Sequence, residues 1–133
     1  MNISKAAKAA GISAKMIRYY EEIALLPKAV RSAAGYREYF PADIERLKFI
    51  YQARQLGFSL DEIKILIQLW QNEQRHSADV KALAQQHVQQ LQEKISQMQH
   101  MVDYLQDLIA SCAGDESAHC SILDKIQHPD HHG

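Results

Sequence analysis

Residues 13–27 read SAKMIRYYEEIALLP, and this stretch decides the architecture expected for the first part of the chain. Its leading serine is a favourable N-cap, so the sequence predicts a helix over 14–23. That helix must end before Pro27, because a residue that precedes proline disfavours the helical conformation. A shorter helix comes before it, with Ser4 as the expected cap and Gly11 as the stop. Two short helices joined by a tight turn have the spacing of a helix-turn-helix.

The next stretch, residues 28–40, lacks helical periodicity. Gly35 lies in its middle among aromatic and arginine residues. Glycine adopts the positive φ angles that tight turns need, so the sequence predicts a small β-hairpin here.

Two further helices are expected after the hairpin. Pro41 fits the first turn of a helix over 42–56, which Gly57 ends. The run SLDE at 59–62 is a capping box that opens a fourth helix, reaching about Gln71. Its apolar residues recur at helical spacing and are expected to face the core: Leu60, Ile63, Leu66, Ile67 and Trp70.

A long helix is expected from Ser77, a favourable N-cap with Asp79 in the first turn. Apolar residues then follow in steps of 4, 3, 4, 3, 4, 3, 4: Ala84, Val88, Leu91, Ile95, Met98, Val102, Leu105 and Ile109. This alternation is typical of a coiled-coil seam. A helix cannot bury such a stripe on itself, so we expect a partner helix, most simply from a second copy of the chain. Packing against the chain's own N-terminal helices is the alternative.

Composition limits the class of protein. The 133 residues are 47% hydrophobic and 23% charged, which excludes a disordered tail or a fibre. No apolar run approaches a membrane span and no secretory signal is evident, so a cytoplasmic location is expected. The net charge of −1 divides into +4 over 1–75 (12 Lys/Arg, 8 Asp/Glu) and −5 over 76–133 (3 Lys/Arg, 8 Asp/Glu). The basic first part suits a polyanionic partner.

Arginine and tyrosine are concentrated on the second predicted helix and in the hairpin segment. The residues are Lys15, Arg18, Tyr19, Tyr20, Arg31, Tyr36, Arg37 and Tyr39. Arginine makes bidentate contacts to phosphates or base edges, and tyrosine hydroxyls donate to phosphates. Adjacent helical residues cannot face the same way, so one of Tyr19 and Tyr20 is expected to pack in the core and the other to point outward.

Both cysteines of the chain lie in the segment CAGDESAHC at 112–120. Gly114 permits the chain to double back, and a loop of this length can bring two sulfurs to one ion. Two thiolates are soft ligands that suit Cu(I), which accepts few ligands, better than Zn(II), which normally takes four. A chance pair of cysteines without a metal is the alternative.

Taken together, these motifs resemble the MerR family of transcriptional regulators. The resemblance rests on IRYYE at 17–21, LLP at 25–27, Arg31, GYR at 35–37, Tyr39 and QARQLGFSLDEI at 52–63. With the long helix, it extends to about residue 126. It implies an all-α fold with a small β wing, in which a winged helix-turn-helix DNA-binding domain spans 1–75. A dimerisation helix over 76–111 would form an antiparallel coiled coil in a homodimer, followed by a metal-binding loop and tail over 112–133.

The resemblance also implies roles for individual residues. The expected DNA contacts are Lys15, Arg18, Tyr20, Arg31, Tyr36, Arg37 and Arg54. The cysteine loop resembles the branch that senses monovalent ions, so Cys112 and Cys120 would bind Cu(I), with Ag(I) or Au(I) as alternatives. Branches for divalent ions carry another cysteine where this chain has Ser77. Ser77 and Lys81 of the partner would lie beside the site, where Lys81 offsets the negative charge of a bis-thiolate holding one Cu(I).

The function that this resemblance implies is that of a copper-responsive activator. The dimer would occupy promoter DNA with or without metal, distort it when metal binds, and so allow RNA polymerase to transcribe copper efflux or detoxification genes.

Three other functions stay open from the sequence. One is a regulator of the same fold that responds to Zn(II) or to thiol oxidation, and another is a copper-buffering protein that does not touch DNA. A Zn(II) site would recruit His119 or the tail residues His128, His131 and His132, although a loose tail is favoured there. An enzyme with a nucleophilic cysteine is disfavoured, because no third group orients His119 as its base.

Overall fold

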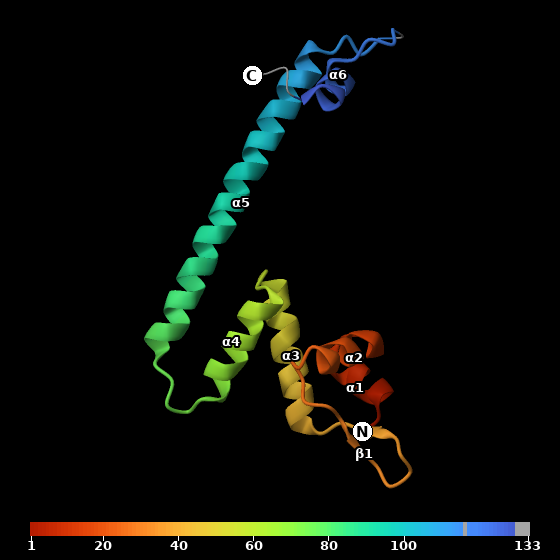
Figure 1. Ribbon diagram of the computed structural model, residues 1–133, viewed down its shortest axis with the longest axis vertical. Helices are drawn as coiled ribbons and strands as arrows, with labels where there is room; N and C mark the ends of the chain where they lie inside the picture. Colours follow the sequence, from red (N-terminus) through yellow and green to blue (C-terminus); the bar gives the residue numbers. More distant parts are fainter. Residues whose placement is uncertain (116, 130–133) are drawn as a thin grey trace. The chain divides into compact units, whose positions relative to one another are not determined.

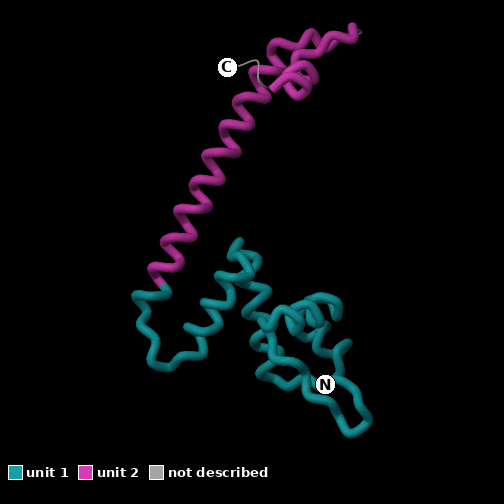
Figure 2. The backbone as a smooth tube through the Cα atoms, in the orientation of Figure 1, with its two compact units in different colours: residues 1–80 teal, residues 81–133 magenta. Residues whose placement is uncertain are grey.

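The chain folds mainly into helices, with one small β-sheet (Figure 1). The computed structural model describes residues 1–115 and 117–129. It divides into two units, residues 1–80 and residues 81–133 (Figure 2). The elements in chain order are α1 (Ile3–Ala10), α2 (Ala14–Glu22), β1 (Val30–Arg31), β2 (Arg37–Glu38), α3 (Pro41–Gln55), α4 (Leu60–Gln71), α5 (Ser77–Ser111) and α6 (Ser121–Gln127). Among the described residues, none of the helices has the length and apolar character needed to cross a bilayer.

Helices α1 and α2 form the predicted helix-turn-helix. The cap of α1 differs from the prediction: Asn2, not Ser4, accepts the hydrogen bond of the Lys5 backbone N–H at 2.8 Å. The helix therefore starts earlier and takes Ser4 into its first turn. Gly11 ends α1 with a φ of +76°, and Ser13 caps α2, both as predicted.

The chain leaves α2 through a tight turn at Ala24. The φ of Ala24 is +63°, a left-handed conformation that residues with a Cβ rarely adopt. The turn directs the backbone N–H groups of Leu25 and Leu26 to the carbonyl oxygen of Tyr20, at 2.9 and 3.1 Å. Both leucine side chains are then buried in the core.

The predicted hairpin is present and forms the wing. Strands β1 and β2 pair antiparallel, with Val30 opposite Glu38 and Arg31 opposite Arg37. Gly35 takes a φ of +85° in the turn, and its N–H donates to the carbonyl of Ser32 at 2.8 Å. The register places two arginines side by side next to the turn of the wing.

Helices α3 and α4 begin as the sequence predicts. Pro41 is the first residue of α3. The capping box of α4 is reciprocal: the Glu62 N–H donates to Ser59 Oγ at 3.1 Å, and the Ser59 N–H donates to Glu62 Oε1 at 2.8 Å.

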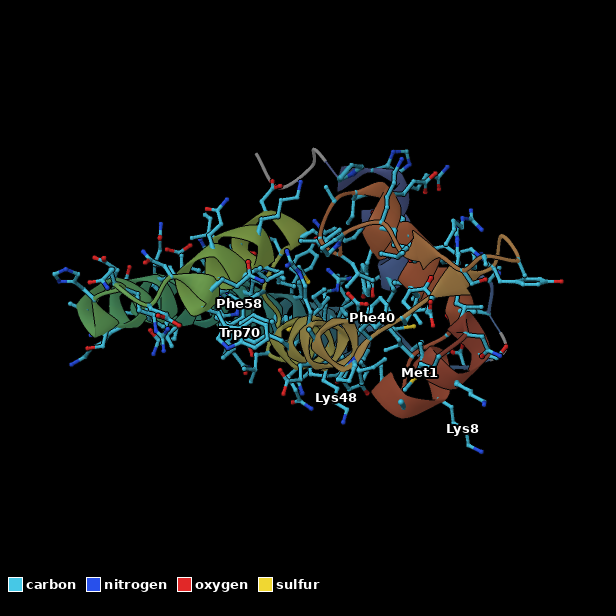
Figure 3. All side chains as sticks on the ribbon, turned by 90° about the horizontal axis from the view of Figure 1, so that it is seen from below. Met1, Lys8, Phe40, Lys48, Phe58 and Trp70 are labelled. Carbon is cyan, nitrogen blue, oxygen red and sulfur yellow. The ribbon has the colours of Figure 1, made fainter. Side chains whose placement is uncertain are left out.

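The core of the first unit lies between these helices and the base of the wing. Its buried members are Ala6, Ala10, Ile17, Tyr20, Leu25, Leu26, Tyr39, Ile44, Leu47, Ile50, Ala53, Ile63 and Ile67. Of the stripe predicted for α4, Leu60 and Leu66 pack half-buried against this core. Trp70, labelled in Figure 3, is 36% exposed. It stacks on Phe49 of α3, with ring centroids 4.4 Å apart.

The second unit holds most of α5, the cysteine loop and α6. Ser77 is the first residue of α5 rather than a cap outside it. Helix α6 occupies part of the segment expected to be loop and tail. Its first residue is tied to the last turn of α5, because Ser121 Oγ donates to the Leu108 carbonyl at 2.9 Å and lies 3.0 Å from Ser111 Oγ. These hydrogen bonds close the loop that carries both cysteines.

The apolar seam of α5 is largely uncovered in the single chain. Ile95 and Met98 are each 64% exposed, and most of the remaining seam residues are also exposed. The face that the sequence marks for helix packing is therefore available to a partner.

Candidate DNA-binding surface and metal site

A basic surface extends over α2 and the wing. It is formed by Lys15, Arg18, Lys28, Arg31, Tyr36 and Arg37. Two hollows of about 640 and about 350 Å³ indent it, and Arg18, Arg31 and Arg37 line both. Three arginines from three elements thus line the same hollows, an arrangement that suits contacts to a phosphate backbone.

Most of the residues predicted to contact DNA are exposed here. Lys15 and Arg18 lie on the outer face of α2, and Tyr36 is 73% exposed beside the wing turn. Arg31 is held across that turn, since its Nη1 donates to the Gly35 carbonyl at 3.2 Å. Arg54 is exposed on α3.

Tyr20 departs from its predicted role. One of the two adjacent tyrosines does pack inward, as predicted, but it is Tyr20, which is 4% exposed, whereas Tyr19 is 40% exposed. Tyr20 follows Ile17 by three residues and shares its core-facing side of α2. Burial raises the pKa of Tyr20, and the charge of Arg54 opposes this. The DNA contact expected from Tyr20 therefore does not fit its position, and Tyr19 is the tyrosine that α2 exposes.

Glu21 is a buried residue of this surface that the sequence motifs did not predict. Its carboxylate is 7% exposed and accepts a hydrogen bond from Tyr39 Oη at 2.5 Å. The pKa of Tyr39 is raised to about 12, mainly by burial and secondly by the hydrogen bond to the Glu21 carboxylate and its negative charge. Arg37 Nη1 lies 3.9 Å from the second carboxylate oxygen. A signal existed, because Glu21 follows the core residue Ile17 by four positions and so lies on the apolar face of α2.

The two cysteines meet at the end of α5. Cys112 Sγ and Cys120 Sγ are 3.7 Å apart, and both residues are half-buried free thiols. The backbone N–H groups of Leu123 and Ile122, together with the Cys112 thiol, lower the pKa of Cys120. This favours the thiolate, which is the metal-binding form.

These two sulfurs fit a metal ion of low coordination number. Within residues 1–115 and 117–129, no third His, Cys, Asp or Glu joins them to form a larger ligand set. His119 is exposed, and His131 and His132 lie outside the described residues. A metal–sulfur bond is about 2.3 Å long, so an ion in line between the sulfurs needs them about 4.6 Å apart. A small rotation of the two side chains from 3.7 Å provides this spacing.

Ser77 and Lys81 are distant from the cysteines of their own chain. Lys81 is exposed near the start of α5, and thirty helical residues separate it from Ser111, next to Cys112. At 1.5 Å per residue these positions are about 45 Å apart. Lys81 therefore does not reach the sulfurs of its own chain.

A winged helix-turn-helix with a basic surface, followed by a long helix, defines a DNA-binding transcription regulator and not an enzyme. The model of the family described as "MerR HTH family regulatory protein" matches residues 1–70. A second family model, described as "MerR, DNA binding", matches residues 44–108. The chain belongs to the MerR family of transcriptional regulators.

Individual relatives match nearly the whole chain. An HTH-type transcriptional regulator of Pseudomonas aeruginosa is 55% identical over 126 residues, which cover 95% of this chain and 96% of the relative. The regulator CueR of Salmonella typhimurium is 43% identical over 132 residues, which cover 99% of this chain and 96% of CueR. Among solved structures, the regulator PbrR691 of Ralstonia metallidurans in complex with lead(II) superposes with a TM-score of 0.83 at 32% identity, covering 95% of this chain and 98% of that one.

Proposed function

We propose that the chain is a homodimeric transcription activator that responds to Cu(I) in the cytoplasm. The observation that carries the proposal is the pair of cysteine sulfurs 3.7 Å apart with no further ligand among the described residues. A soft monovalent ion is satisfied by two thiolates, whereas Zn(II) in a structural site normally takes four ligands. Ag(I) and Au(I) share this preference, and the similarity to PbrR691, whose structure is a complex with lead(II), supports a metal-sensing role.

The homodimer follows from the symmetry of the α5 seam. The steps of 4 and 3 read the same in both directions. An antiparallel copy consequently places every seam residue against a seam residue of its partner: Ala84 against Ile109, Val88 against Leu105, Leu91 against Val102, and Ile95 against Met98. The exposure of this face in the single chain supports the pairing.

The same pairing completes the metal site. In this register Lys81 of one protomer lies level with Cys112 of the other. A bis-thiolate with one Cu(I) carries a net charge of −1, and the partner's lysine would offset it. Ser77 of the partner would lie one turn further along, beside the same loop. Each metal site would then include residues from both protomers.

Such a site suits a switch between two dimer geometries. The proposed DNA contacts are Lys15, Arg18, Arg31, Tyr36 and Arg37 of the basic surface, together with Arg54 of α3. Metal binding at the ends of the coiled coil would favour one orientation of the two DNA-binding units. The promoter DNA would be distorted, and RNA polymerase would engage it to transcribe copper efflux or detoxification genes.

The test is in vitro transcription from a copper-efflux promoter, with and without Cu(I), for the wild type, Cys112→Ser and the loop control Ser117→Ala. We expect Cu(I) to activate the wild type and the control but not Cys112→Ser. A metal-competition experiment on the reduced protein is the second test, and we expect Cu(I) or Ag(I) to displace Zn(II). If Zn(II) instead displaced Cu(I) and Ag(I), the copper assignment would be refuted.

A second candidate is a thiol-redox regulator, favoured by the closeness of the two sulfurs. Thiols 3.7 Å apart need only a small approach to form a disulfide, whose S–S bond is about 2.0 Å. Transcription by the oxidised, metal-free protein would favour this candidate. Transcription only by the reduced, Cu(I)-loaded protein would exclude it.

A further inference from the structure

A buried carboxylate lies behind the basic surface. Glu21 is 7% exposed and lines the larger hollow together with lysine and arginine side chains. Burying a charge is costly unless polar partners compensate for it. The partners of Glu21 are the hydroxyl of Tyr39 at 2.5 Å and the guanidinium of Arg37 at 3.9 Å. Tyr39 is itself 1% exposed, so this hydrogen bond anchors the carboxylate in the core.

Arg37 has an inner and an outer end. Its Nη1 is buried and, among the described residues, has no hydrogen-bond partner, and it lies 3.9 Å from Glu21 Oε2. The side chain is nevertheless 30% exposed, so the exposed part belongs to the rest of the side chain. Arg37 also lines both hollows beside Arg18 and Arg31. The guanidinium thus lies between a buried anion and the surface proposed to meet DNA.

We propose that Glu21 is a positioning residue for DNA binding, which holds the Arg37 guanidinium from behind so that its outer face meets a DNA phosphate. Tyr39 fixes the carboxylate, and the carboxylate orients the arginine. Because Glu21 is on α2 and the other two residues are on or beside β2, the cluster also joins the wing to the second helix of the helix-turn-helix. This inference rests on the proposed DNA contact of Arg37.

The charge of Glu21 makes the inference sharply testable. Removing a negative charge from a DNA-binding surface strengthens binding by electrostatics alone. If Glu21 acts only through its charge, Glu21→Gln should bind DNA more tightly. If it positions Arg37, the same substitution should bind DNA more weakly, although the surface becomes more basic.

The experiment measures affinity for a labelled duplex that the wild-type protein selects from a random-sequence library, over a range of salt concentrations. We expect Glu21→Gln to weaken binding about tenfold, a coupling of the size found for residues that share one network. The slope of log affinity against log salt should decrease in magnitude by about one, the change expected on losing one phosphate contact, and Arg37→Gln should show the same decrease. Glu22→Gln is the matched control, because this exposed glutamate lines the same hollow, and its loss should leave binding unchanged or tighter.

A double-mutant cycle separates positioning from general destabilisation. In the Arg37→Gln background, Glu21→Gln should cause no further loss of affinity and should leave binding unchanged or tighter, whereas additive losses would overturn the inference. Should Glu21→Gln fail to fold, Glu21→Asp retains the charge but retracts it by one methylene, and it too should weaken binding only when Arg37 is present. If Arg37→Gln leaves binding unchanged, the proposed DNA contact fails. If Arg37→Gln weakens binding and Glu21→Gln does not, only the positioning role of Glu21 fails.

Discussion

Replacing Ile95 with alanine tests whether the seam of α5 is a dimer interface. Ile95 is 64% exposed in the single chain, and the antiparallel register places it against the partner's Met98 near the centre of the coiled coil. Full burial of an isoleucine side chain contributes about 1.5–3 kcal/mol. Scaled by the exposed fraction, the dimer should gain roughly 1–2 kcal/mol from each Ile95, or about 2–4 kcal/mol from the pair. The dimer dissociation constant should therefore rise between about 30-fold and about 900-fold in Ile95→Ala.

Sedimentation equilibrium over a range of protein concentrations measures this constant directly. Alanine has a higher helix propensity than isoleucine, so loss of helix cannot explain weaker association. Gln97→Ala is the control, because Gln97 is exposed on the same helix but lies off the seam. A dissociation constant for Ile95→Ala within threefold of the wild type, or equal weakening by Gln97→Ala, would refute the reasoning.

The first unit offers further tests by urea or thermal unfolding. Tyr39→Phe leaves the buried Glu21 carboxylate without its hydroxyl donor and should lower the free energy of unfolding by about 1.5–3 kcal/mol; an unchanged value would contradict the buried hydrogen bond. The pKa of Tyr39 is raised to about 12 from its ordinary value of 10.0, so its contribution to stability is complete below pH 10 and is lost as the pH rises through 12. An ultraviolet titration of the folded protein should show a last tyrosine ionisation that Tyr39→Phe removes. Ser59→Ala removes half of the capping box and should cost about 0.5–2 kcal/mol, seen as a lower melting temperature; no change would mean that the cap does not stabilise α4. Ala24→Gly relieves a left-handed alanine and should stabilise the fold by up to about 1 kcal/mol, and a lower urea midpoint would show that the turn is not strained.

Signals that act within a few residues predicted the secondary structure well. The caps at Ser13 and Ser59, the stop at Gly11 and the first turn at Pro41 all appear as expected. The starts of α1 and α5 are the exceptions. Asn2 and Ser4 are both favourable caps, and only the folded chain shows that Asn2 caps α1. Ser77 is the first residue of α5 and not its cap.

Side-chain orientation depended on contacts that are distant in sequence. Periodicity indicates that Tyr19 and Tyr20 face different ways, but only packing against the core decides that Tyr20 is inside. The burial of Glu21 depends on Tyr39, eighteen residues away on the far side of the wing. Its spacing from Ile17 places Glu21 on the apolar face of α2, but only the contact with Tyr39 shows that a charged side chain is buried there.

The sequence by itself determined the order of the first five helices, the wing, the two-cysteine loop and the symmetric seam, because each of these depends on local spacing and residue type. It did not predict α6. Only the tertiary structure decided which side chains form the basic surface and that the sulfurs approach to 3.7 Å. It also closed the cysteine loop, through hydrogen bonds between Ser121, Ser111 and the Leu108 carbonyl. The physical reason is that hydrogen bonding and periodicity act over a few residues, whereas burial and charge pairing depend on segments that meet only when the chain has folded.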